Sequence, residues 1–147
     1  RGIDGDTTDG VLARLSTVLR GRPSKIILLI GTNDLGLKRP REQILANVGE
    51  IVRRIRDSGH GPELVVQSVM PRHAKFSPRI RELNQEYQRL SARLGGEYLD
   101  LWPALSDDQN SLKPEFTLDD LHLTGAGYRT WANVLEPHIS TSTGKGL

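Results

Sequence analysis

Two short apolar runs constrain the fold of this chain more than any other feature. The run "KIILLIG" places five consecutive apolar residues between Lys25 and Gly31, and "ELVVQSV" at 63–69 has the same character. Such runs are too short for a helix, and their content of β-branched residues suits strands that are covered on both faces. Strands of this kind are usually parallel, so the runs predict a parallel sheet.

Segments with apolar residues at helical spacing surround these runs. They cover residues 8–21, 44–55 and 80–94, and glycines follow each of them closely. In the first segment, Thr8 or Asp9 is able to cap the start of the helix. We therefore expect three amphipathic helices, each with one face buried.

The C-terminal third continues the same alternation. "EYLDL" at 97–101 is predicted to be a third short strand, and a last helix is expected from Thr124 to about Leu135. Helices that alternate with strands are typical of an α/β fold with a mostly parallel sheet. At 147 residues the chain has the length of one domain, predicted at 1–138, with a flexible tail at 139–147.

The amino-acid composition argues against several classes of function. A net charge of only +2 and an aromatic content of 5% argue against a nucleic-acid binder, because such proteins carry basic stripes and stacking residues. No apolar run approaches the roughly 20 residues of a membrane span. The absence of cysteine excludes disulfides and a thiol nucleophile, but it does not indicate a compartment. Localisation therefore stays open.

Polar residues follow the predicted strands, where ligands of open parallel sheets bind. Asp119 and His122 are three residues apart, and an imidazole beside a carboxylate can move protons near neutral pH. On this spacing alone, the better interpretation is a turn stabilised by Asp119 or Asp120 with His122 on a surface loop. The interpretation as a metal site has less support still, because the other histidines lie in unrelated segments.

Two further residues are candidates for stabilising negative charge on an oxygen. Asn33 follows the first strand in "GTND", where its amide could donate to a developing oxyanion, although a simple turn explains it equally well. Gly5 offers a backbone N–H without side-chain obstruction, or it is only a turn glycine. A phosphate-binding loop is set aside, because the glycine spacing and the lysine of such loops are missing.

Taken together, "RGIDGDTT", "IGTNDL" and "DDLHLTGAGY" resemble the second, third and fifth sequence blocks of the SGNH hydrolases, also called the GDSL esterase/lipase family. "SVMPRHAKFSPRIRELNQEYQRL" is similar to the platelet-activating-factor acetylhydrolase-like and lysophospholipase-like members. The resemblance covers nearly the whole chain. It implies a three-layer α/β/α fold with a flavodoxin-like parallel sheet, here without the family's first strand and most of its second.

The resemblance also implies a role for each candidate. His122 would be the general base and Asp119 its orienting carboxylate, while Gly5 and Asn33 would form the oxyanion hole. A small acyl ester of the acetyl type would be the substrate, with no cofactor and no metal. The family's Gly-Asp-Ser block, which carries the nucleophilic serine, is absent from this sequence.

Two hypotheses of different classes follow. In the first, the chain is part of a serine esterase whose serine lies outside these 147 residues. In the second, it is a catalytically inactive fragment or a binding module of the same fold, and a flavodoxin-like nucleotide binder is a distant third. Loss of two strands would leave "KIILLIG" as an open apolar edge, so we expect an N-terminal piece or self-association to cover it.

Overall fold

The computed structural model describes residues 6–140, which form two compact units. The first consists of residues 6–69 and 81–99, and the second of residues 70–80 and 100–140. Within the described part of the chain, no helix is long and apolar enough to span a membrane.

The first unit is built on a three-stranded parallel sheet. Strands β1 (Lys25–Leu28), β2 (Glu63–Gln67) and β3 (Glu97–Leu99) lie side by side in the order β1-β2-β3. Lys25 aligns with Glu63, and Val65 aligns with Glu97. The predicted α/β class with a parallel sheet flanked by helices is confirmed.

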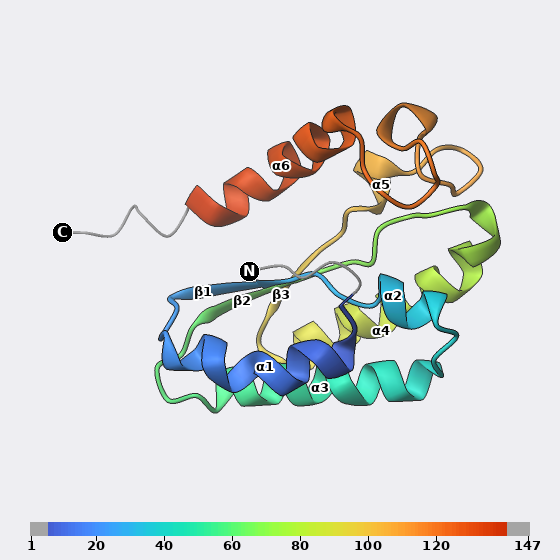
Figure 1. The fold of residues 1–147 in the computed structure, drawn as a ribbon. Coiled ribbons are helices and arrows are strands. Elements are labelled where there is room, and N and C mark those ends of the chain that lie inside the picture. Colours follow the sequence, from blue (N-terminus) through green and yellow to red (C-terminus); the bar gives the residue numbers. More distant parts are fainter. Residues whose placement is uncertain (1–5, 141–147) are drawn as a thin grey trace. The chain divides into compact units, whose positions relative to one another are not determined.

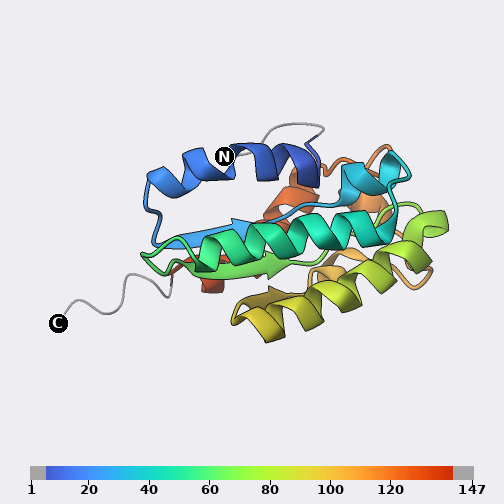
Figure 2. The ribbon, with the colours of Figure 1, turned by 90° about the horizontal axis from the view of Figure 1, so that it is seen from below.

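Three amphipathic helices cover one face of this sheet. They are α1 (Thr8–Arg20), α3 (Arg41–Arg56) and α4 (Ser77–Leu94), and they lie next to one another in that order (Figures 1 and 2). Their apolar stripes supply much of the core, and α3 alone buries Ile44, Val48, Ile51, Val52 and Ile55. Burial of these aliphatic side chains is the main favourable term in folding.

The helix starts differ from the sequence prediction. Thr7, not Thr8 or Asp9, caps α1, because its side chain accepts a hydrogen bond from the Gly10 N–H. Thr8 is instead fully buried. The short helix α2 (Thr32–Gly36) was not predicted, since five residues are too few to show a periodicity.

The second unit contains short elements and one long helix. These are η1 (Ala74–Phe76), α5 (Trp102–Leu105), η2 (Pro114–Phe116) and α6 (Gly125–Ser140). Isolated antiparallel bridges join Ser106 to Leu112 and Thr117 to Leu123.

Helix α6 continues about one turn and a half beyond its predicted end near Leu135 and contains Pro137. Residues 139 and 140 of the predicted tail belong to this helix, and the remainder of that tail lies outside the described residues. The assignment of 1–138 to a single domain stays a prediction.

Candidate active site

Asn33 lies in α2, which residues 29–31 connect to the carboxyl end of β1. The turn that places it there requires glycine at position 31, whose φ of 123° is unfavourable for other residues. A Cβ atom on Gly31 would lie 2.7 Å from the hydroxyl oxygen of Tyr87. That buried hydroxyl donates a hydrogen bond of 3.0 Å to the carbonyl of Ile30. Glycine 31 and Tyr87 together therefore determine how the chain leaves β1.

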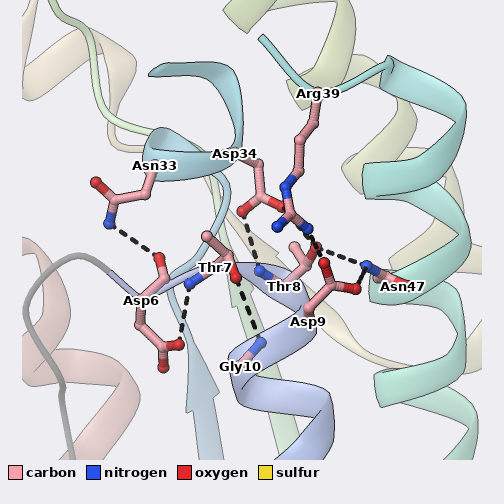
Figure 3. Close-up of polar contacts among 9 residues, drawn as sticks. All are labelled: Asp6, Thr7, Thr8, Asp9, Gly10, Asn33, Asp34, Arg39 and Asn47. Carbon is pink, nitrogen blue, oxygen red and sulfur yellow. Dashed lines mark hydrogen bonds and ion pairs between the residues drawn. The ribbon is translucent and has the colours of Figure 1, made fainter. Parts of the chain in front are cut away.

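The Asn33 amide is anchored to the segment that precedes α1. Its Nδ2 donates to the backbone carbonyl of Asp6 at 2.9 Å (Figure 3). The Asp6 carboxylate in turn accepts from the Thr7 N–H at 2.9 Å and pairs with Arg14 at 2.6 Å. It crosses the first turn of α1 so closely that a Cβ on Gly10 would lie 2.0 Å from it. The position of Asp6 is thus set from several sides.

Asp34, the next residue of α2, makes a second connection to α1. Its buried carboxylate accepts from the backbone N–H of Thr8 at 2.9 Å and from the Thr8 hydroxyl at 2.7 Å (Figure 3). Burial, together with the Asp34 charge, raises the pKa of Tyr87 above its ordinary value. Asp34 and Thr8 were missed by sequence reasoning, although the acidic residue stands directly after Asn33.

Asp119 and His122 lie in the second unit, in a loop closed by the bridge between Thr117 and Leu123. The Asp119 Oδ2 and the His122 Nδ1 are 2.7 Å apart. The other carboxylate oxygen accepts from the backbone N–H groups of Leu121 and His122, at 3.0 and 2.7 Å. The loop therefore brings the predicted pair into direct contact.

The protonation of this pair follows from its hydrogen bonds. Donation from the His122 side chain, and then from its backbone N–H, holds the pKa of Asp119 well below its usual range. Asp119 is consequently a carboxylate, which can only accept, so the hydrogen between the two residues belongs to Nδ1. The His122 Nε2 is then the basic nitrogen, on a side chain that is 79% exposed. The exposed carboxylate–imidazole pair is competent for proton transfer.

The remaining candidates have the following positions. Gly5 lies outside the described residues, and Asn33 belongs to the first unit. Ser68 is fully buried, and its N–H bonds the carbonyl of Leu99. Residues 6–140 contain no group of three or more His, Asp or Glu side chains that could hold a metal ion.

Residues 1–130 match the sequence profile of the GDSL-like lipase/acylhydrolase family. The chain belongs to this family. Its members include lipases and acylhydrolases, which act on esters, and the resemblance seen in the three sequence blocks is confirmed.

Individual relatives agree with this assignment. An arylesterase of Vibrio mimicus is 28% identical over 131 residues, which represent 80% of this chain and 56% of the arylesterase. A Streptococcus pneumoniae structure, described provisionally as a platelet activating factor, is 31% identical, with a TM-score of 0.85 over 94% of this chain and 70% of its own. A GDSL-like lipase structure from Bacteroides thetaiotaomicron, 21% identical, has a TM-score of 0.86 over 97% of this chain and 75% of its own. The chain spans little more than half the length of the arylesterase.

Proposed function

We propose that this chain carries the base and the oxyanion-stabilising groups of a serine esterase. His122 acts as the general base, Asp119 orients it, and Asn33 with Gly5 supplies the oxyanion donors. The nucleophilic serine comes from polypeptide outside these 147 residues. The observation that carries the proposal is the 2.7 Å contact between Asp119 and His122, because it engages Nδ1 and leaves Nε2 as the ring nitrogen that can take a proton from the serine.

The chemistry follows from these roles. The serine hydroxyl attacks the ester carbonyl while the His122 Nε2 takes its proton, and Asp119 stabilises the resulting imidazolium. Donors at Asn33 and Gly5 stabilise the charge on the carbonyl oxygen. His122 then returns the proton to the leaving alcohol, and water releases the acyl group by the same steps in reverse. The proposed substrates are esters of short acyl groups such as acetate.

The test is hydrolysis of p-nitrophenyl acetate by the chain combined with a polypeptide that carries the Gly-Asp-Ser block. We expect hydrolysis, a single fluorophosphonate adduct on that block, and loss of both after His122→Ala. The matched control is His60→Ala, which removes an imidazole from the loop before β2. Hydrolysis that survives His122→Ala would overturn the proposal, and an adduct on a serine of this chain would overturn its account of the nucleophile.

Acyl-chain preference is tested with the acetate, butyrate and octanoate esters of p-nitrophenol. A kcat/KM that falls from acetate to octanoate is expected, and the opposite order would contradict the proposed substrate class. The second candidate function is a binding module of the same fold. Absence of hydrolysis and of any adduct in the combined protein would favour it.

We also propose that an added polypeptide segment pairs with the open edge of β1. No strand among residues 6–140 pairs with the edge of β1 that faces away from β2. A groove of about 930 Å³ runs along this strand between α1 and α3. Its lining is mostly apolar and includes Val11, Leu15, Val18, Ile26, Ile27, Leu29 and Ile51. An unpaired strand beside an apolar groove is a template for strand addition.

Hydrogen exchange of the β1 amides tests this proposal. Addition of the Gly-Asp-Ser polypeptide should slow exchange at β1 and leave the amides of α4 unchanged. The alternative partner at this edge is a second copy of the chain. Self-association would make the sedimentation mass of the chain alone depend on concentration, and Ile27→Lys should weaken it. Unchanged exchange at β1 after addition of the polypeptide, together with a mass that does not depend on concentration, would contradict any partner at this edge.

A further inference from the structure

The contacts around Asn33 form two parallel connections between the same two segments. Asn33 and Asp34 are adjacent in α2, and their partners Asp6 and Thr8 are two residues apart at the start of α1. The partners are 26 and 27 residues apart in sequence. Because the two connections share both segments, movement of one must strain the other.

The first connection engages only one of the two N–H donors of the Asn33 amide within the described residues. A side-chain amide has two N–H donors, and only one of them is occupied by the Asp6 carbonyl. The structure gives the second donor no acceptor within the described residues. The bond to Asp6 thus fixes the plane of the amide, and among residues 6–140 nothing competes with a ligand oxygen for the other N–H.

The second connection is directional. Asn47 of α3 donates to the Thr8 hydroxyl at 2.9 Å and to Asp9 at 2.8 Å (Figure 3). A hydroxyl has one hydrogen, so Thr8 accepts from Asn47 and donates its own hydrogen to Asp34. Arg39 pairs with Asp9 and lies 3.9 Å from Asp34. The chain of donors from Asn47 through Thr8 to Asp34 is therefore supported at both ends.

We infer that Thr8 and Asp34 are positioning residues for the Asn33 amide. They act by holding residues 6–8 against α2, so that Asp6 presents its carbonyl to Asn33 and the free N–H keeps one direction. The consequence for catalysis rests on the proposed function, since oxyanion donors act through preorganisation. A buried carboxylate is otherwise unfavourable, and this role accounts for its place beside Asn33.

Side-chain NMR on the chain itself tests the inference without any catalysis. Thr8→Val removes the hydroxyl at nearly constant volume, whereas Thr8→Ser retains it. In Thr8→Val the order parameter of the Asn33 side-chain nitrogen should fall from the rigid value of about 0.85 to below about 0.6, and Thr8→Ser should restore it. Asn84, whose amide bonds the N–H and carbonyl of Val69, is the internal control.

An unchanged Asn33 order parameter in folded Thr8→Val would overturn the inference. Asn47→Ala is a milder variant that covers the case in which Thr8→Val does not fold. It removes the donor to Thr8 from a half-buried position, and we expect a smaller fall in the Asn33 order parameter than in Thr8→Val. An Asn33 order parameter equal to wild type in Asn47→Ala would also count against the chain of donors.

Kinetics in the combined protein adds a second test. Asn33→Ala should lower kcat about 100-fold or more, and Thr8→Val about 10-fold, with KM unchanged in both. In the Asn33→Ala background, Thr8→Val should cause no further loss, because its effect passes through Asn33. An equal loss in both backgrounds would overturn the inference. No effect of Asn33→Ala would instead reject the proposed function, and the NMR result would still decide the positioning role.

Discussion

The two groups of candidate residues are held in opposite ways. Asn33 is positioned by buried and part-buried contacts between residues 26 to 39 apart, and both Thr8 and Asp34 have no exposed surface. Asp119 and His122 are three residues apart, and their side chains are 52% and 79% exposed. The amide therefore depends on the folded core of the first unit, whereas the imidazole depends on one local turn.

This difference predicts which mutations should lower stability and which should alter protonation and chemistry. Changes around Asn33 remove buried hydrogen bonds or close packing, so they should lower the free energy of unfolding. Changes in the turn remove contacts that water can replace, so they should alter protonation and chemistry with little effect on folding. The predictions below test this contrast, beginning with the largest expected effect.

Asp34→Ala should be the most destabilising change. It leaves the buried N–H and hydroxyl of Thr8 without their acceptor, and each lost partner costs about 1–3 kcal/mol. The expected loss in the free energy of unfolding is roughly 4 kcal/mol, measured by urea denaturation of the chain. Asp108→Ala, at an exposed position, is the control. A loss in the free energy of unfolding below about 1 kcal/mol would contradict this contrast, because the buried connection would then be no stronger than a surface contact.

Gly31→Ala is expected to be next, at about 3 kcal/mol, because both backbone strain and a clash contribute. The φ of 123° disfavours any side chain, and the new methyl would meet the buried hydroxyl of Tyr87. Gly95→Ala is the matched control, since Gly95 also has a positive φ but has nothing within 4 Å of its Cβ position. Equal losses for the two variants would mean that the packing around Gly31 contributes nothing.

Tyr87→Phe should cost about 1 kcal/mol, the usual value of one buried hydrogen bond. It also removes the atom nearest to the Cβ position of Gly31, which leaves Val69 at 3.2 Å as the next neighbour. Gly31→Ala should therefore be less destabilising in the Tyr87→Phe background than in wild type. Strict additivity in this double-mutant cycle would show that the two residues do not interact.

The same contrast explains which parts of the molecule could be predicted from sequence. The parallel strands and the helices α1, α3 and α4 follow from apolar patterns within single segments. The spacing of three residues permits the Asp119–His122 contact, but that spacing alone favours a simple turn, and the pairing is implied by the family resemblance. Thr8 was interpreted only as a helix cap, because its contact with Asp34 joins segments that no local pattern relates. The short helix α2 is determined by Gly31 and Tyr87, which come from different elements. Sequence reasoning thus fails where several elements meet.

The smallest effect on folding is expected from the protonation of Asp119. Hydrogen bonds from the side chain and backbone of His122 hold the pKa of Asp119 below the ordinary value of about 3.9. The carboxylate therefore contributes its stabilisation above the unfolded pKa, and that contribution is lost as the pH falls through the lower folded pKa.

Carbon-detected NMR of the Asp119 carboxyl measures this pKa directly. We expect a midpoint below about 3.9 in wild type and a shift upward in His122→Ala, which removes the largest cause of the depression. Thr117→Val should shift it less, because the Thr117 hydroxyl makes the longest of the hydrogen bonds to the Asp119 carboxylate, at 3.2 Å. The urea midpoint of His122→Ala should lie only slightly below that of wild type at pH 7, because the lost contribution comes from an exposed turn. A large loss of global stability in His122→Ala would mean that the turn is coupled to the core, and the two groups of candidate residues would then be held in the same way.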